Sequence, residues 1–280
     1  MTTSLEEVVH YSLEVEPGNI VSLNDYIGGE LHIQFLNEIH CVFCGKITPK
    51  SYGGGSCYSC LQALPQNDMC QVKPELCHLD RGTCRDADWG RKHCCSPHKV
   101  YLARSSGVKV GITREEPTST RWMDQGAVEG MVIAIVPDRK SSGMVETAIA
   151  QHIADKTDFR KMLRGDITDT DLQEVYEDIA DHVPLAYQSF LVDDPKPIRI
   201  AYPLAENPEK IKTKSLDKTP EISGTLKGIK GQYLIFEDFV FNVRAHTGYS
   251  VEMHGKKGPG YQAPEPKVEP DEPMTLFDFM

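Results

Sequence analysis

Two Cys-x-x-Cys pairs constrain this chain more than any other feature of its sequence. Cys41 and Cys44 form the first pair, Cys57 and Cys60 form the second, and twelve residues separate the two pairs. Pairs at this spacing can place four thiolates around one Zn²⁺ ion, which prefers four sulfur or nitrogen ligands in a tetrahedron. The sequence therefore predicts a structural zinc ribbon.

The cysteine count favours metal binding over disulfide bonds. All nine cysteines lie between Cys41 and Cys95, and nine is an odd number. A secreted disulfide framework would pair its cysteines, whereas metal-binding thiols are typical of a reducing compartment. The first residues lack a basic stretch followed by an apolar run, and no window is apolar enough to span a bilayer. We therefore expect a cytoplasmic protein that makes no membrane contact.

A second zinc ion is expected in the same region, although the spacing of its ligands is irregular. His78 or His98 could replace one of the four thiolates in a tetrahedral site. The alternative is that these two histidines and Cys95 are structural residues without metal. The predicted ligands are Cys70, Cys77, Cys84 and Cys94.

Charge is unevenly distributed along the sequence. The formal net charge of −11 argues against nonspecific binding to DNA or to anionic membranes. Between Arg81 and Arg121, however, nine basic residues stand against four acidic ones. This segment predicts a local basic surface on an acidic protein, with a solvated face of mixed charge as the alternative.

Apolar spacing divides the chain into five parts and predicts an α+β protein. Short alternating runs near the N-terminus are typical of half-buried strands joined by glycine turns. Strand and helix patterns follow the cysteines and predict a three-stranded sheet with flanking helices, before further runs that predict a small antiparallel domain. The expected parts are a β segment (1–40), a Cys-rich zinc-binding region (41–99), an α/β core (100–185), a C-terminal β domain (186–253) and a disordered tether with a terminal apolar peptide (254–280).

The α/β core has the clearest individual elements. Its strands are expected at 100–104, 108–113 and 131–136, with a short helix at 121–127. A long helix is expected at 142–163, where Ser142 would cap the first turn. Another helix is expected at 171–180, where Thr170 and Gln173 are placed as a capping box.

The core also carries a pattern of functional side chains. Tyr101 precedes Val108-Lys-Val-Gly-Ile-Thr113, and Arg121 and Glu146 follow. This order resembles the GIY-YIG nuclease superfamily, in which a tyrosine, a helical arginine and a glutamate converge beside a small sheet. By the resemblance, Tyr101 is the tyrosine of the first half-motif and Gly111 is the glycine of the second.

The resemblance also implies roles for the charged residues. Arg121 would stabilise the charge that develops on the phosphorus, and Glu146 would bind a divalent cation, Mg²⁺ or Mn²⁺. Lys109 stands where the family has its second tyrosine, and Gln125 stands where many members have a histidine. Lysine is a poor base at neutral pH, although it can hold a phosphate group.

The sequence as a whole resembles a prokaryotic family catalogued only as a domain of unknown function, over nearly all of residues 30–250. Together the resemblances imply a metal-dependent, structure- or site-selective endonuclease that acts on DNA, with the zinc ribbon positioning the substrate. Lys99, Arg104 and Arg114 are the expected nucleic-acid contacts. The alternative is a zinc-dependent nucleic-acid-binding protein whose core no longer cuts. Lys109 favours this alternative.

The C-terminal peptide predicts a partner protein. A flexible tether followed by Met274-Thr-Leu-Phe-Asp-Phe-Met280 suits insertion into a hydrophobic groove. The peptide resembles the motif by which replication proteins bind the sliding clamp, although Pro273 and Met280 depart from that motif. The alternative is that the peptide folds back on its own chain. The expected contact residues are Leu276, Phe277, Phe279 and Met280.

Overall fold

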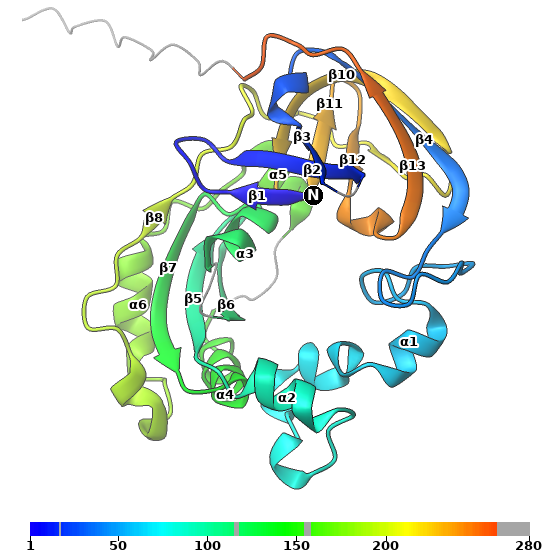
Figure 1. The fold of residues 1–280 in the computed structure, drawn as a ribbon. Coiled ribbons are helices and arrows are strands. Elements are labelled where there is room, and N and C mark those ends of the chain that lie inside the picture. Colours follow the sequence, from blue (N-terminus) through cyan, green and yellow to red (C-terminus); the bar gives the residue numbers. More distant parts are fainter. Residues whose placement is uncertain (17, 115–117, 154–157, 262–280) are drawn as a thin grey trace, which may run out of the picture.

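Three β-sheets organise the computed structural model, which describes residues 1–16, 18–114, 118–153 and 158–261 (Figure 1). A small sheet near the N-terminus contains β1 (Thr2–Ser4), β2 (His10–Glu16) and β3 (Asn19–Ser22). The six-stranded sheet has the order β13-β4-β10-β11-β12-β9, with β4 (Glu30–Ile39), β9 (Thr213–Lys214), β10 (Glu221–Lys230), β11 (Tyr233–Phe236), β12 (Val240–Asn242) and β13 (Tyr249–Gly255). The core sheet has the order β6-β5-β7-β8, with β5 (His98–Arg104), β6 (Val108–Arg114), β7 (Glu129–Val136) and β8 (Ile198–Arg199). The mixed α+β class is confirmed.

Helices are short and lie mostly around the core sheet and in the Cys-rich region. The α-helices are α1 (Tyr58–Ala63), α2 (Ala87–Cys94), α3 (Thr118–Asp124), α4 (Arg139–Ile149), α5 (Phe159–Arg164) and α6 (Leu172–Ala180). The 3₁₀ helices are η1 (Asn24–Tyr26), η2 (Pro65–Asn67), η3 (Met69–Gln71), η4 (Pro74–Leu76), η5 (Leu79–Arg81), η6 (Leu185–Phe190) and η7 (Arg244–His246). No helix in the described ranges is both long enough and apolar enough to cross a membrane.

The six-stranded sheet pairs a strand from the N-terminal part of the chain with strands from the C-terminal part. In β4, Ile33 pairs with Ile222 of β10 on one side and with Met253 of β13 on the other. In the sequence, β4 falls in the expected N-terminal β segment, whereas its two partners fall in the expected C-terminal β domain. Their pairing is non-local, so strand patterns alone did not reveal it.

Strand β5 lies between two apolar clusters because successive side chains in a strand point to opposite faces. Val100 and Leu102 pack with α4 and α6, whereas Tyr101 and Ala103 pack toward the six-stranded sheet. All four are at most 1% exposed. Full burial of one Val or Leu side chain contributes about 1.5 to 3 kcal/mol, so the register of β5 is strongly fixed.

The prediction of one long helix at 142–163 is wrong. Helix α4 begins earlier, because the Asp138 carboxylate accepts a hydrogen bond from the Ser141 N–H at 2.8 Å, while Ser142 lies inside the first turn. A separate helix, α5, starts after Asp158, which caps it. The cap of α6 is Asp171, which accepts from the Gln173 N–H at 2.7 Å, rather than Thr170. In each case an aspartate provides the cap.

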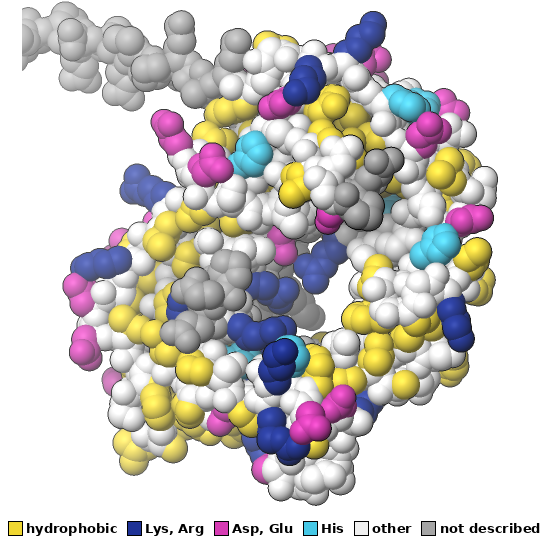
Figure 2. Space-filling view, viewed as in Figure 1, with side chains coloured by type: hydrophobic (Ala, Val, Ile, Leu, Met, Phe, Trp, Pro, Cys, Tyr) yellow, Lys and Arg dark blue, Asp and Glu magenta, His cyan; other side chains and the backbone are white. Residues whose placement is uncertain are grey.

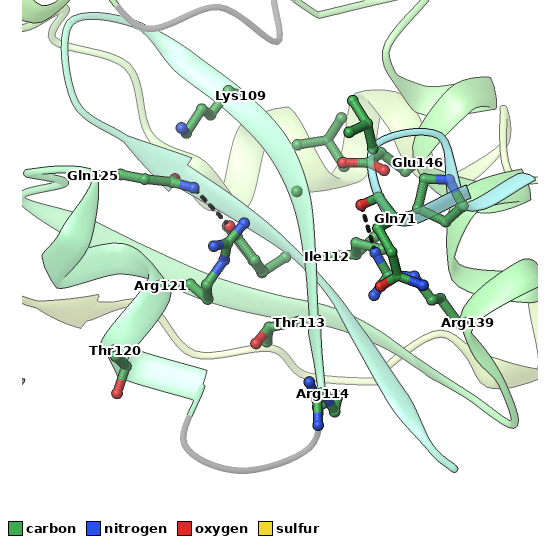
Figure 3. A pocket seen from close by; sticks show the side chains of 15 residues that line it. Gln71, Lys109, Ile112, Thr113, Arg114, Thr120, Arg121, Gln125, Arg139 and Glu146 are labelled. Carbon is green, nitrogen blue, oxygen red and sulfur yellow. Dashed lines mark hydrogen bonds between the residues drawn. The ribbon is translucent and has the colours of Figure 1, made fainter. Parts of the chain in front are cut away.

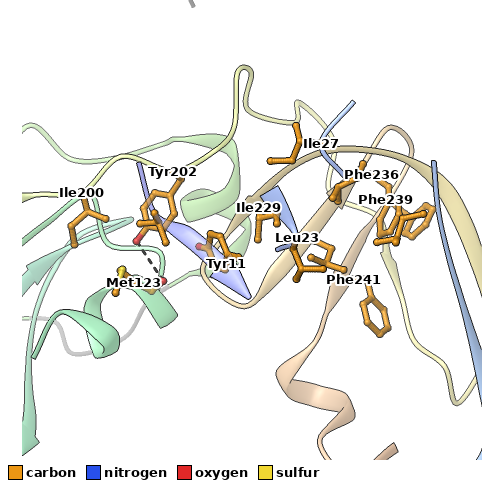
Figure 4. Close-up of a cluster of buried hydrophobic side chains, with 14 of the residues drawn as sticks. Tyr11, Leu23, Ile27, Met123, Ile200, Tyr202, Ile229, Phe236, Phe239 and Phe241 are labelled. Carbon is orange, nitrogen blue, oxygen red and sulfur yellow. Dashed lines mark hydrogen bonds between the residues drawn. The ribbon is translucent and has the colours of Figure 1, made fainter. Parts of the chain in front are cut away.

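Buried polar contacts hold α3 between the core sheet and the six-stranded sheet. The Tyr202 hydroxyl donates to the carbonyl oxygen of Ala127 at 2.7 Å, and the Gln232 amide donates to the Asp124 carboxylate at 2.7 Å. Figure 4 shows Tyr202 in the cluster that links the two sheets, reaching Met123 at the end of α3. The end of α3 is therefore held by the segment after β8 and by the turn between β10 and β11.

Replacing Tyr202 with Phe tests this link. The Tyr202 hydroxyl is buried, and its loss leaves a buried carbonyl without its donor, so we expect a destabilisation of about 1 to 2 kcal/mol. Urea unfolding followed by circular dichroism measures it. Tyr58→Phe is the matched control because Tyr58 is 61% exposed. Equal midpoints for the two variants would contradict the prediction.

Candidate functional site

The four cysteines of the two Cys-x-x-Cys pairs lie together. Their sulfur atoms are all within 4.8 Å of one another, and the Cys44 and Cys57 sulfurs are 3.8 Å apart. Zn–S bonds of about 2.3 Å in a tetrahedron place the sulfurs about 3.8 Å apart. The four residues are Cys41, Cys44, Cys57 and Cys60, and their geometry fits a structural zinc ion.

Local backbone geometry brings the two pairs together. Gly45 follows the first pair with a φ of +72°, and its N–H donates to the carbonyl oxygen of Cys41 at 2.8 Å. Gly55 precedes the second pair with a φ of +112°, and a Cβ there would lie 2.8 Å from a Val42 methyl group. Glycine is required at both turns because L side chains rarely adopt positive φ.

Electrostatics also favour a cation among these thiols. Burial disfavours the Cys41 thiolate, but the main-chain N–H groups of Cys57, Cys44 and Phe43 outweigh it and lower the Cys41 pKa. Burial raises the pKa of Cys60, and so do its hydrogen bonds with the other three sulfurs. One thiol therefore ionises readily while another resists, and a divalent cation would stabilise all four as thiolates.

The second predicted zinc site is not assembled as a set of four thiolates. The ligand atoms that lie within 4.8 Å of one another in this part of the described chain belong to Asp68, Cys70 and His78. Asp68 is already paired with Arg85 at 2.8 Å, so its carboxylate has a structural partner. His98 is fully buried and bonds the Ser96 carbonyl oxygen at 2.8 Å, as the structural alternative predicts.

Two members of the predicted set nevertheless share a neighbour. The Gln71 amide nitrogen lies 3.9 Å from the Cys70 sulfur and 4.0 Å from the Cys94 sulfur. Burial raises the pKa of both thiols, and Cys77 raises it further. Cys84 donates a hydrogen bond to the Asp86 carbonyl oxygen at 3.2 Å.

The four residues predicted to be catalytic line one cavity of about 570 Å³. Tyr101 comes from β5, Lys109 from β6, Arg121 from α3 and Glu146 from α4. Figure 3 shows Lys109 and Arg121 on one side of strand β6, and Glu146 on the other. The fold thus gathers side chains from four separate elements.

Tyr101 and Gly111 are opposite each other in the β5–β6 pair. A Cβ at position 111 would lie 2.6 Å from the Tyr101 hydroxyl oxygen, so any larger residue would displace the ring. Tyr101 also packs edge-on against Trp122, with 5.8 Å between ring centroids, and accepts a hydrogen bond from Gln125 at 3.3 Å. Burial raises the Tyr101 pKa, although Arg121 partly offsets the effect. The phenol therefore stays protonated at neutral pH.

The cavity is predominantly basic. Four cations line it, whereas Glu146 is the one carboxylate among the described residues that line it. The face of the molecule that Figure 2 draws has a hollow near its middle, and Lys and Arg side chains lie at the border of this hollow. The four cations are Lys109, Arg114, Arg121 and Arg139. A site of this charge attracts anions.

The predicted nucleic-acid contacts have different locations. Arg114 is exposed and lines the cavity. Arg104 instead forms an ion pair with Glu129 at 3.0 Å and donates to the Thr168 carbonyl oxygen at 3.2 Å, so this residue has a structural role. Lys99 lies on the same face of β5 as Tyr101 but is not among the described residues that line the cavity.

The sequence did not predict that Arg139 and Gln71 would line the cavity. Arg139 precedes Glu146 by seven residues on α4, a spacing that places both on one helix face and could have revealed it. Gln71 comes from the Cys-rich region, and no sequence signal connects it to the core. The predicted partner-binding residues Leu276, Phe277, Phe279 and Met280 lie outside the described residues.

Comparison with known proteins identifies a family. A family model described as "Protein of unknown function (DUF2797)" matches residues 28–251, which include the four-cysteine centre, the cavity and most of the six-stranded sheet. The chain belongs to this family. Neither the search of curated proteins nor the search of solved structures gives a match.

Replacing Cys57 with Ser tests the zinc centre. We expect one equivalent of zinc less per chain than in the wild type and a destabilisation of about 4 kcal/mol or more, because a structural metal contributes directly to folding. Elemental analysis and thermal unfolding measure the two effects. Cys95→Ser is the control, since Cys95 is exposed and outside the four-cysteine group. Unchanged zinc content in Cys57→Ser would contradict the assignment.

Proposed function

We propose that this protein is a metal-dependent endonuclease of the GIY-YIG type that cleaves phosphodiester bonds in DNA. One observation carries the proposal: Tyr101, Lys109, Arg121 and Glu146 come from four elements yet line a single basic cavity. Packing alone does not require polar side chains to converge in this way. Their types also match the needs of phosphodiester hydrolysis.

Each side chain has a distinct role in this proposal. Arg121 stabilises the negative charge that develops on the phosphoryl oxygens. The protonated Tyr101 hydroxyl, oriented by Gln125 at 3.3 Å, donates a hydrogen bond to a phosphate oxygen or to the attacking water. Lys109, which is 8% exposed, supplies a fixed positive charge in place of a second tyrosine.

Glu146 is the metal ligand in this proposal. Mg²⁺ and Mn²⁺ are often held by one or two carboxylates together with substrate phosphates, so a single glutamate in a basic cavity fits this mode. The ion would supply a Lewis acid and an activated water. Glu146 itself fixes where that chemistry occurs, because α4 is packed on the core sheet through Val145 and Ile149.

A second candidate function is nucleic-acid binding without cleavage. The observation in its favour is that Lys109 replaces a tyrosine and that Tyr101 is only 1% exposed. A protein of this kind would bind nucleic acid with an affinity that falls steeply as salt increases. It would yield no metal-dependent products.

The proposal includes recruitment by a sliding clamp through residues 274–280. The apolar side chains of this peptide suit a hydrophobic groove on the partner. The zinc ribbon would position the substrate.

Substitutions at Glu146 and Arg121 test the catalytic proposal. We expect Glu146→Gln to abolish cleavage in Mg²⁺ or Mn²⁺, and Arg121→Ala to slow it about 10² to 10³-fold, because each removes a charge that the transition state needs. Cleavage is measured on single-stranded, branched and duplex DNA by gel electrophoresis. The control is Glu177→Gln, an exposed carboxylate on α6. Wild-type rates in both active-site variants would eliminate this site.

Substitutions in the C-terminal peptide test recruitment. Leu276→Ala combined with Phe279→Ala should weaken clamp binding by about 30-fold or more, because buried anchors dominate such interfaces. Calorimetry with purified clamp measures the affinity. Thr275→Ala is the neighbouring control and should bind as the wild type does. No binding by the wild-type chain would remove the clamp from the proposal.

A further inference from the structure

Arg139 lines the cavity, but none of the roles proposed above is assigned to it. It is the first residue of α4, two turns before Glu146, and its side chain lines the same cavity. Figure 3 shows it beside Gln71, on the same side of β6 as Glu146. Arg139 is half-buried, so its charge is partly removed from water.

The guanidinium group of Arg139 is incompletely satisfied. One terminal nitrogen donates to the Gln71 carbonyl oxygen at 2.8 Å. The Nε atom is buried and has no hydrogen-bond partner among the described residues. A guanidinium carries five N–H donors in a planar fork that matches the oxygens of a phosphate or carboxylate. The unmet Nε donor is costly, and an anion that binds the other N–H groups of this cavity-lining side chain would offset that cost.

The surroundings of Arg139 favour an anionic ligand. Arg114 and Arg121 line the same cavity, and the charge of Arg114 disfavours the Arg139 cation. Burial lowers the Arg139 pKa; the thiols of Cys94 and Cys70 and the Glu146 carboxylate partly offset this effect, whereas Arg114 adds to it. Four cations and one carboxylate among the described lining residues make a cavity that attracts anions.

The Cys-rich region fixes Arg139 in this position. Its acceptor, the Gln71 carbonyl, belongs to η3, and the Gln71 side chain contacts the sulfurs of Cys70 and Cys94. Helix α4 packs so closely on η4 that a Cβ at Gly143 would lie 2.4 Å from the main-chain nitrogen of Glu75. The Lys140–Asp80 ion pair at 2.7 Å is exposed and contributes little to this anchoring. Arg139 is thus anchored before any ligand arrives.

From this geometry we propose that Arg139 binds a phosphate group of the nucleic acid, at a subsite between Glu146 and the Cys-rich region. The assignment of the phosphate to nucleic acid rests on the proposed function. The subsite holds a phosphate other than the one being cleaved, because Arg121 acts on the reacting phosphate in the proposed function. The Cys-rich region is in this way part of the substrate site.

Binding measurements in a non-cleaving background test the subsite. A fluorescein-labelled 20-nucleotide DNA, single-stranded or duplex, is titrated with the Glu146→Gln protein over a range of NaCl concentrations, and anisotropy is recorded. Adding Arg139→Gln should weaken binding about 5- to 10-fold and reduce the slope of log Kd against log [NaCl] by about 0.7 to 0.9, the value for one phosphate contact. Adding Arg139→Lys should keep the slope but weaken binding about 3-fold, because lysine lacks the fork.

Lys140→Gln is the matched control. It removes the same charge from the next residue of α4, and Lys140 is not among the described residues that line the cavity. Equal effects of Arg139→Gln and Lys140→Gln on slope and affinity would overturn the proposal. Thermal unfolding and zinc content establish that each variant is folded. If Arg139→Gln does not fold, the Arg139→Lys variant tests the subsite instead. DNA binding by that variant as tight as that of Glu146→Gln alone would overturn the subsite.

Three further outcomes separate this proposal from others. If calorimetry shows inorganic phosphate binding that Arg139→Gln abolishes, while DNA binding is unaffected, the subsite serves a free phosphate and the nucleic-acid assignment fails. If the wild type cuts no DNA but Arg139 governs the salt slope, the subsite stands and the endonuclease proposal fails. If the wild type cuts DNA and Arg139→Gln leaves KM unchanged, the endonuclease stands and the subsite fails.

Discussion

The contact between Tyr101 and Gly111 is the constraint on which the cavity depends. The tyrosine ring lies across the glycine of the neighbouring strand, and it fits there only because position 111 has no side chain. The same ring packs on Trp122, which brings α3 and Arg121 beside β5. On the other face of β5, Val100 and Leu102 pack with α4, which carries Glu146 and Arg139. One strand with two buried faces therefore sets the positions of both helices that supply the cavity.

The Cys-rich region packs against the helix that covers the core sheet and contributes to the same cavity. Gln71, Val72 and Pro74 line the cavity, and η4 lies against α4 too closely for a side chain at Gly143. The short 3₁₀ helices of this region have little apolar core of their own, so docking on α4 supplies packing that the region lacks.

The sequence predicts those parts of the fold that depend on local patterns. The two Cys-x-x-Cys pairs, the three strands around Tyr101 and the helix from 171 to 180 all follow from spacing within short segments. Features that depend on register or on distant segments were not predictable in this way. Arg104 was expected to contact nucleic acid, but the register of β5 with β7 places it opposite Glu129. The pairing of β4 with β10 and β13 joins residues about 190 to 220 positions apart, and Gln71 reaches Arg139 only through tertiary packing.

The contrast between the net charge of the protein and its cavity bears on selectivity. An overall charge of −11 repels a polyanion, whereas Lys109, Arg114, Arg121 and Arg139 attract one within a limited space. Long-range repulsion is screened beyond about 8 Å at physiological salt, so attraction by the cavity dominates only at short distance. On the proposed function, such a protein gains little from sliding along uniform duplex. On the same proposal, it would favour substrates whose backbone can enter the cavity, and a clamp would supply the local concentration that its own charge does not provide.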